Sequence, residues 1–406
     1  MAQSMSLNSA AGLSGMLKSG HRHMEGVEGA VLRNVEAAKD LSRIVSTSLG
    51  PNGMNKLVVN HLERIIVTSD CAAIVRELEI EHPAARMLSM AAEAQDRECG
   101  DGTNLTVSFA GELLTRTEGL IRMGLHVSEI AAGYRKAGDK LAELLPTLVT
   151  GAMGDGRNPD ELIRVLSPVI GAKQYGSESI LAPLVAEACI CAMGTGDKRP
   201  SVNADSVRVA KILGGSVSQT SVVRGYVALR GPETTVTEAT DAKITVFGCG
   251  VEASATEAKG TVLMKDAEDL KGYNKTEEKK MEEIVKSIAD SGTKVVVSGG
   301  TVSEMALHFI ERYGMMCLKI GSKWELRRLC SAVGATALVR LGPATPDEMG
   351  HADSVKVREV GGRRVTVFSR GTDDDGDCRI ATVLLRASTS NLLADLERAV
   401  DDGVSA

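Results

Sequence analysis

The chain has 406 residues, a formal net charge of −6, 25% charged residues and only 2% aromatic residues. This acidic balance, with so few rings for base stacking, argues against a protein that binds nucleic acid or a membrane surface. No apolar run reaches spanning length, and eight scattered cysteines form no C-x-x-C pair. We therefore expect a cytoplasmic protein, and the length predicts two or three domains.

The first part of the chain is predicted to be largely helical as far as Leu145. Apolar residues at helical spacing lead to the breaker cluster Leu49-Gly50-Pro51-Asn52-Gly53, where the first helix should end. The β-rich runs 56–60 and 64–68 predict a hairpin. Asp70 follows it and precedes an apolar helix, where a helix N-cap is a commoner role than catalysis.

A short glycine-rich loop, Gly100-Asp101-Gly102-Thr103-Asn104, leads into a helix predicted over 104–122. Its glycines permit positive φ and a close approach of the backbone to a ligand, and we expect Thr103 to cap the helix. The N–H groups of that helix start would face the same anion, and Asp101 is well placed to hold Mg²⁺ against it. The loop thus indicates a magnesium–nucleotide site, although an ordinary acidic loop is the commoner explanation of four such residues.

The sequence pattern is different over residues 151 to about 215. There Lys173 lies between glycines, after a helix predicted over 160–168. Such a lysine could reach a phosphate, but most are simply solvated. From 211 to 370 strands alternate with helices, which predicts an α/β domain. The charged run 265–280 should be an exposed excursion from it.

An amphipathic helix predicted over 322–335 would turn Trp324, Arg328 and Ser331 outward. A tryptophan beside arginines is typical of a protein-contact face, and packing of this ring on the domain edge is the alternative. Beyond it, the strand-like runs 363–370 and 379–386 flank the acidic stretch 373–377, which we expect to be a hairpin turn. A last helix is predicted over 391–400.

Several of these stretches are similar to one known family. They are Leu49–Lys56, Thr68–Ile74, His82–Ala85, Gly100–Asn104, Lys173–Gly176, Ser322–Leu329 and Leu396–Asp402. Together they resemble the group II chaperonins, the TCP-1 family, over essentially the whole chain. Several are typical of one subunit type of the eukaryotic cytosolic chaperonin.

The resemblance implies a multidomain α+β and α/β fold in three parts. Residues 1–150 would be the N-terminal half of a helical, ATP-binding equatorial domain. Residues 151–216 would form the first strip of a hinge-like intermediate domain, and 368–406 its second strip with the start of the equatorial return. Residues 217–367 would be an α/β apical, client-binding domain with a helical protrusion near 264–285 that closes as a lid.

The resemblance also implies roles for particular residues. The implied nucleotide-binding residues are Leu49, Gly50, Pro51, Gly100, Asp101, Gly102, Thr103, Asn104 and Lys173. Among them Asp101 would hold Mg²⁺ and Lys173 would sense the γ-phosphate of ATP. Asp70 and Asp402 would orient and activate the attacking water, and the outward face with Trp324, Arg328 and Ser331 would bind clients.

The implied function is an ATP-hydrolysing folding chaperone of the cytoplasm. Its partners would be paralogous subunits in a double ring and unfolded cytosolic proteins such as actin and tubulin, with no nucleic acid and no membrane. Asn52 and Asn104 depart from the family pattern, and we expect them to weaken hydrolysis.

The sequence stops four residues after Asp402, before the family's last equatorial segment. We expect either a fragment of a longer product or a truncated paralogue. This leaves an alternative, a non-catalytic client-binding or regulatory module, whereas the presence of Asp70, Asp101 and Asp402 favours the ATPase.

Overall fold

The computed structural model describes residues 27–60, 63, 65–151, 153–154, 156–193, 201–252, 267–370 and 380–406. The chain divides into two compact units. The first unit comprises Met1–Pro183 and Ala394–Ala406, and the second comprises Leu184–Leu393. The three-part division expected from the resemblance stays a prediction. The acidic stretch 373–377 lies outside the described residues.

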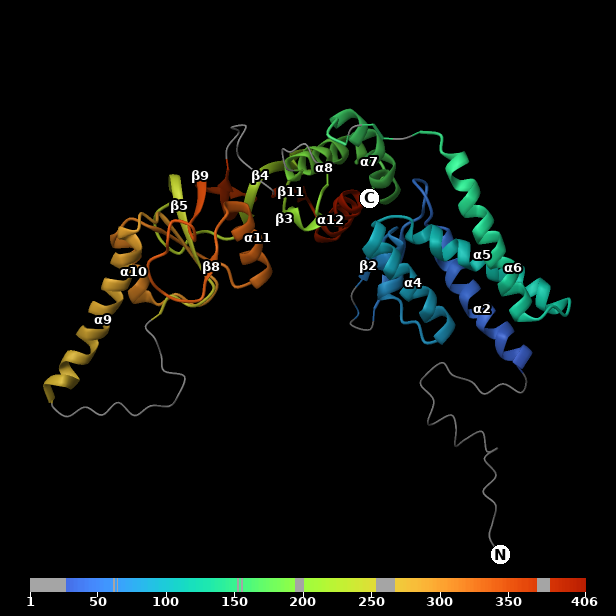
Figure 1. Ribbon diagram of the computed structural model, residues 1–406, viewed down its shortest axis with the longest axis horizontal. Helices are drawn as coiled ribbons and strands as arrows, with labels where there is room; N and C mark the ends of the chain where they lie inside the picture. Colours follow the sequence, from blue (N-terminus) through green and yellow to red (C-terminus); the bar gives the residue numbers. More distant parts are fainter. Residues whose placement is uncertain are drawn as a thin grey trace, which may run out of the picture. The chain divides into compact units, whose positions relative to one another are not determined.

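The first unit is built from helices and one small hairpin. Its elements are α2 (Val27–Ser46), β1 (Lys56–Val59), β2 (Ile65–Thr68), α3 (Cys71–Glu77), α4 (Pro83–Cys99), α5 (Thr103–Arg122), α6 (Val127–Leu144) and α7 (Pro159–Lys173). Helices α2, α4 and α5 pack against one another, as Figure 1 shows in blue to teal. Their core includes Leu41, Val45 and Val107, each at most 5% exposed. The predicted hairpin is confirmed, with Lys56 opposite Thr68.

Two helices extend further than the sequence predicted. Helix α7 continues through Pro168 as far as Lys173, because its apolar face, which includes Leu166 and Ile170, is buried along the whole length. Lys173 therefore ends a helix and does not lie in a loop between glycines. Helix α12 (Ser390–Ser405) likewise carries Asp402 on its last turns, where the prediction ended the helix at Val400.

In the sequence, one helix precedes the sheet-forming part of the second unit and another follows it. The division between the units falls within α8 (Glu178–Ala192) and within α12. The remaining elements are β3 (Val207–Leu213), β4 (Ser221–Ala228), β5 (Glu238–Phe247), α9 (Ala267–Asp290), β6 (Val295–Ser298), α10 (Glu304–Arg312), β7 (Met316–Lys319), α11 (Lys323–Val333), β8 (Ala337–Leu338), β9 (Gly350–Val360), β10 (Arg363–Ser369) and β11 (Ala381–Ala387).

The described strands of the second unit form one mixed sheet of nine strands. The order is β3-β11-β4-β10-β9-β5-β6-β7, with β8 beside β5. Strands β5, β6 and β7 are parallel and are connected through α9 and α10, whereas β9, β10 and β4 pair antiparallel. The expected α/β arrangement is therefore confirmed for the parallel part. Because β4 lies between β10 and β11, the predicted hairpin of these two strands is wrong.

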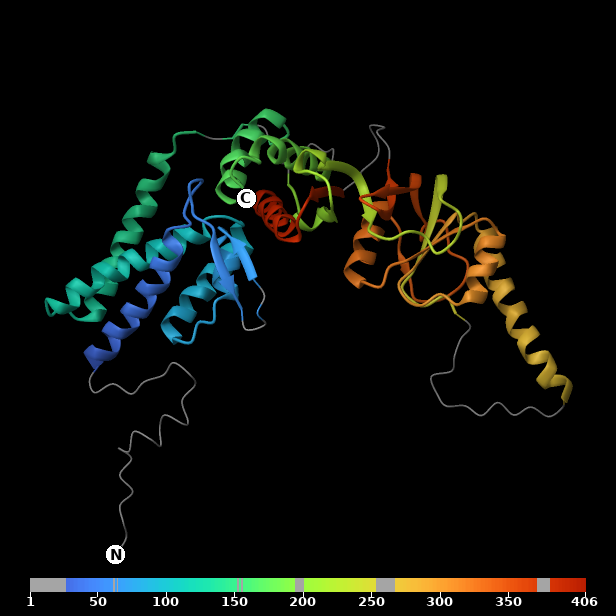
Figure 2. The same ribbon diagram turned by 180° about the vertical axis from the view of Figure 1, so that it is seen from behind.

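Alternate side chains of the parallel strands enter two different cores. Ile244 and Val246 of β5 pack in the core that α11 covers with Leu329, whereas Phe247 packs in the core shared with α9 and α10. This alternation is the pattern of strands buried on both faces. In Figure 2, α9 extends away from the sheet and its C-terminal end lies beside α10. Of the predicted charged excursion 265–280, residues 265 and 266 and the side chains of 267–277 lie outside the described residues, and residues 278–280 are exposed.

Candidate functional site

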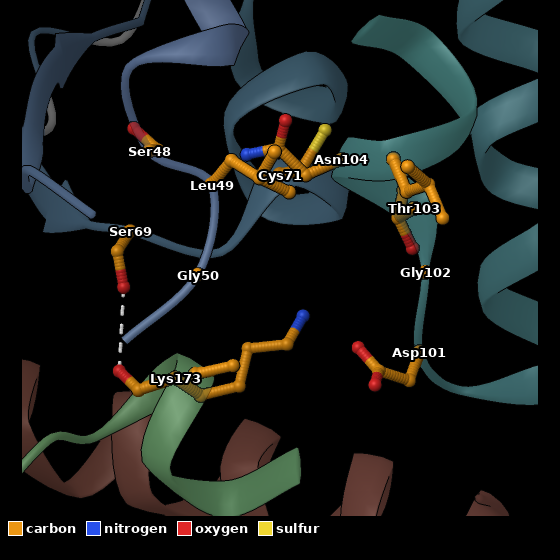
Figure 3. Close-up of a pocket in the computed structure, with 12 residues that line it drawn as sticks. Ser48, Leu49, Gly50, Ser69, Cys71, Asp101, Gly102, Thr103, Asn104 and Lys173 are labelled. Carbon is orange, nitrogen blue, oxygen red and sulfur yellow. Dashed lines mark hydrogen bonds between the residues drawn. The ribbon is translucent and has the colours of Figure 1, made fainter. Parts of the chain in front are cut away.

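The first unit contains a cavity of about 230 Å³ at the meeting point of four chain segments (Figure 3). It lies between the end of α2, the β2–α3 junction, the loop before α5 and the end of α7. Its lining residues are Ser48, Leu49, Gly50, Ser69, Cys71, Asp101, Gly102, Thr103, Asn104, Leu105, Ala172 and Lys173. Seven of the nine residues predicted to bind nucleotide are among them. Segments far apart in the sequence thus converge on one cavity.

Glycines shape the backbone around this cavity. Gly50 has φ of +79° and Gly102 has φ of +78°, conformations that glycine adopts without a steric penalty. Gly100, with φ of +67°, ends α4 and packs so closely on α12 that an added Cβ would lie 2.5 Å from that of Ser405. It therefore contributes to the packing of α12 and does not line the cavity, and neither does the exposed Pro51.

Thr103 corrects one sequence prediction. It is the first residue of α5, whose N-cap position is taken by Gly102 and has no side-chain hydrogen bond. The Thr103 side chain is therefore not the cap. Its hydroxyl is buried and has no hydrogen-bond partner among the described residues, although it belongs to the cavity lining. A buried, unpaired hydroxyl at a helix N-terminus fits a site whose missing acceptor is an anionic ligand.

Asn104 uses its side chain inside the protein. Its amide Nδ2 donates to the carbonyl of Val45 at 3.1 Å, and its Oδ1 accepts from the hydroxyl of Ser108 at 3.0 Å. The first bond joins the start of α5 to the end of α2, immediately before the Leu49–Gly50 side of the cavity. The Asn104 side chain thus holds two walls of the cavity together.

Lys173 lies between two carboxylates. Its ammonium is 2.6 Å from Oδ1 of Asp70 and 3.0 Å from Oδ2 of Asp402. All three side chains are nearly buried. Asp70 also caps α3 by accepting from the N–H groups of Ala72 and Ala73, so the N-cap role considered from the sequence and the charged cluster are both present.

Burial and charge act in opposite directions on the two carboxyl groups. Burial raises the pKa of Asp402 to about 7, because the attraction to Lys173 offsets it only in part and the charge of Asp70 adds to it. Burial would also raise the pKa of Asp70, but the Lys173 ammonium and the N–H of Ala73 lower it below its usual value. The cluster therefore combines a carboxylate that stays ionised with one that exchanges a proton near neutral pH.

Asp101 faces Lys173 across the cavity. Figure 3 shows its carboxylate turned toward the end of the lysine side chain. Its own backbone carbonyl accepts a hydrogen bond from Gln95 at 2.9 Å, which fixes the loop. Among the described residues no group of three His, Cys, Asp or Glu side chains could hold a metal. A lone carboxylate fits Mg²⁺, which usually takes one or two carboxylates together with phosphate oxygens and water.

Comparison with known proteins assigns the family. Residues 41–406 match the model of the TCP-1/cpn60 chaperonin family. The chain belongs to this chaperonin family. It is 52% identical to "T-complex protein 1 subunit theta" of Arabidopsis thaliana over 97% of the chain and 71% of that protein. The human theta subunit is 49% identical over 98% of the chain and 71% of its own length.

These matches confirm the resemblance found in the sequence, including the subunit type, which is theta. The Dictyostelium discoideum theta subunit agrees, with 45% identity over 97% of the chain and 72% of that protein. The chain is thus a chaperonin chain, and chaperonins serve protein folding. In the part that the structure describes, no helix is long and apolar enough to cross a membrane.

A second candidate surface of this chaperonin chain lies on α11, in the second unit. Trp324 is 73% exposed, so the alternative that its ring packs on the domain edge is wrong. Ser331 is exposed and Arg328 is half-buried, with its guanidinium 3.6 Å from Asp205. Glu325, beside Trp324, pairs with the buried Arg208 of β3. These ion pairs fix the helix and leave the Trp324 face open.

Sequence reasoning missed several residues around the cluster. Cys71 lines the cavity, and burial together with the charge of Asp70 raises the pKa of its thiol to about 12, so it stays protonated and unreactive. Asp395 lies on α12 two turns before Asp402, and Arg398 lies one turn before it. Their spacing of three, four and seven residues was visible in the sequence, and it would have placed all three on one helix face.

Proposed function

We propose that this chain is an ATP-dependent protein-folding subunit of a hetero-oligomeric cytosolic chaperonin. In this proposal it assembles with paralogous subunits in a double ring in the cytoplasm and binds unfolded proteins, actin and tubulin among them. ATP hydrolysis drives closure of the lid formed by the protrusion near 264–285. The word "subunit" in the names of its relatives supports partners of the same family.

One observation carries the nucleotide part of the proposal. The buried unpaired hydroxyl of Thr103, the ammonium of Lys173 and the carboxylate of Asp101 belong to the same cavity. A donor, a cation and a metal-binding oxygen are what a magnesium-bound triphosphate requires. The positive-φ glycines Gly50 and Gly102 keep that wall free of side chains, so the backbone can approach phosphate oxygens.

The residues of the cluster have distinct roles in this proposal. Asp101 would hold Mg²⁺, which when bound would supply neutralisation of charge on the phosphate oxygens. Lys173 binds the γ-phosphate, and its movement away from Asp70 and Asp402 reports that the phosphate is present. Asp70 stays ionised and orients the attacking water, whereas Asp402, with a pKa of about 7, accepts its proton. The Trp324 face of α11 takes up apolar segments of unfolded clients.

The test compares the purified chain with single variants for binding and hydrolysis of ATP in the presence of Mg²⁺. We expect Asp402→Asn to bind ATP but to hydrolyse it at least about a hundredfold more slowly, the usual scale for loss of a general base. Asp101→Asn should remove the dependence of ATP binding on Mg²⁺. The exposed pair Lys140–Glu143 supplies the control, Lys140→Met, which should change neither. A chain that binds no ATP with Mg²⁺ would contradict the proposal.

Client binding needs its own assay. An unfolded protein is offered to the chain, and its capture is compared with that by Trp324→Ala, which should bind clients more weakly and ATP unchanged. If the chain captures unfolded protein but binds no ATP, the alternative of a non-catalytic client-binding or regulatory module replaces the ATPase.

A further inference from the structure

A second ion pair lies next to the cluster of Asp70, Lys173 and Asp402. Helix α12 carries Asp395, Arg398 and Asp402 at successive turns, so all three belong to one face. Asp402 contacts Lys173, and one turn earlier the guanidinium of Arg398 pairs with the carboxylate of Asp395. The side chain of Asp395 is 14% exposed and that of Arg398 is 29% exposed. None of the roles proposed above involves this partly buried ion pair.

The pair is joined to Asp70 at two points. The backbone N–H of Asp70 donates to the hydroxyl oxygen of Thr68 at 3.1 Å, and Thr68 donates in turn to the carboxylate of Asp395. Arg398 provides the second connection, since its Nε lies 3.9 Å from Oδ2 of Asp70. Both the main chain and the side chain of Asp70 are thereby tied to the same face of α12.

The two cations approach different oxygens of the Asp70 carboxylate. Lys173 donates to Oδ1, whereas Arg398 faces Oδ2. The Nε–H of Arg398 is buried and has no hydrogen-bond partner among the described residues. A buried donor without an acceptor is costly unless another state of the protein uses it. At 3.9 Å it acts on Asp70 through charge, and a small shift would make it a hydrogen bond.

This arrangement matters when the lysine moves. When the Lys173 ammonium turns to a phosphate in the cavity, it moves away from Oδ1 of Asp70. The shortest ion pair of the cluster is then lost. Among the described residues, Asp70 would then be a buried carboxylate held by the N–H groups of Ala72 and Ala73 and by the charge of Arg398. A buried carboxylate without a nearby cation tends to take up a proton. A protonated Asp70 could no longer orient water as an acceptor.

We propose that Arg398, held in place by Asp395, is a positioning residue that supplies the counter-charge of Asp70 once Lys173 has turned to a phosphate. The proposal rests on the nucleotide function proposed above. Arg398 contacts neither the cavity nor the reacting atoms. Its effect reaches the reaction through the charge and the orientation of Asp70.

The first test separates binding from hydrolysis. Arg398→Gln removes the charge but keeps a polar group near the position of the arginine Nε, Arg398→Lys restores the charge, and Arg116→Gln makes the same change in an exposed ion pair of α5. We expect Arg398→Gln to lower the single-turnover rate of ATP hydrolysis about tenfold or more, with ATP affinity within about threefold of the unmodified chain. Arg398→Lys should recover most of the rate, and Arg116→Gln should lose none. Equal losses of rate and affinity, or no rescue by lysine, would overturn the proposal.

A second test needs no nucleotide. Lys173→Met imitates the absence of the ammonium from Asp70, and hydrogen exchange of the α3 amides reports how firmly Asp70 caps that helix. We expect Arg398→Gln to accelerate this exchange at least about fivefold more in the Lys173→Met background than in the unmodified chain, because there Arg398 is the one cation left beside Asp70 among the described residues. Equal factors in the two backgrounds would overturn the proposal.

The two tests also keep the proposals distinct. If the unmodified chain neither binds nor hydrolyses ATP, the proposed function fails, while the exchange measurement still decides whether Arg398 takes over from Lys173. If the chain hydrolyses ATP and Arg398→Gln leaves its rate unchanged, the function stands and the role of Arg398 is wrong.

Discussion

The Lys173→Met substitution tests the buried cluster directly. Methionine matches the length of lysine but has no charge, so Asp70 and Asp402 would face one another without the cation that now lies 2.6 and 3.0 Å from their oxygens. Removing one partner of a buried ion pair costs about 3–5 kcal/mol in measured cases. Asp402 can escape part of this cost by taking up a proton. We therefore expect Lys173→Met to lower the free energy of unfolding by about 3 kcal/mol at a pH of about 8.

The cost of Lys173→Met depends on pH through the Asp402 carboxyl group. The folded chain raises the pKa of Asp402 to about 7, above its value in the unfolded chain, so this group stabilises the folded chain at low pH and the stabilisation is lost as pH rises through about 7. Without Lys173 the pKa rises further, so the loss continues to higher pH. The cost of Lys173→Met should thus be about 1 kcal/mol smaller near pH 5.5 than near pH 8.

Hydrogen exchange of the α3 amides is the suitable assay, because the N–H groups of Ala72 and Ala73 bond to the Asp70 carboxylate. A cost of about 3 kcal/mol corresponds to roughly hundredfold faster opening. Lys140→Met, in an exposed pair, should cost less than about 1 kcal/mol. Adding Asp402→Asn to Lys173→Met should recover part of the loss. Unchanged exchange, or the same acceleration at both pH values, would refute the account of the cluster.

Three further predictions concern the cavity and its pH response. The kcat/KM of ATP hydrolysis, which reports the nucleotide-free chain, should fall about tenfold per pH unit below the pKa of about 7 of Asp402, because its base form is required; a flat profile of kcat/KM against pH would contradict this. Thr103→Val removes a buried unpaired hydroxyl, so it should stabilise the ligand-free chain by about 1 kcal/mol and should weaken ATP binding. A thermal melt measures the stability and a titration measures the affinity for ATP. A destabilised variant would contradict the unpaired hydroxyl. Gly50→Ala should cost about 1 kcal/mol for its positive φ alone, whereas Gly100→Ala should cost more, because its Cβ would also clash with α12; equal melting shifts would show that this packing is not as described.

Local features of the sequence predicted much of the site. The breaker cluster after α2 and the glycine-rich loop before α5 are set by glycine's freedom at positive φ, which needs no knowledge of distant contacts. The hairpin β1–β2 followed from two β-rich runs with a polar turn between them. The meeting of Asp70, Lys173 and Asp402 could not follow from spacing, and only the family resemblance suggested it.

The wrong predictions have a common physical origin. Proline inside a helix usually ends or kinks it, yet α7 continues past Pro168 because buried apolar side chains on both sides of it hold the helix. The strands β10 and β11 are neighbours in the sequence, but β4 pairs with both. In each case tertiary packing overrode a local preference.

A structure of the chain with Mg²⁺ and a non-hydrolysable ATP analogue would test the central claim most directly. The account predicts phosphate density in the cavity against the backbone of Gly50 and Gly102, the metal at Asp101, and the Lys173 ammonium moved from Asp70 to the terminal phosphate. An empty cavity at saturating analogue, or a nucleotide bound elsewhere with Lys173 still paired to Asp70 and Asp402, would contradict it.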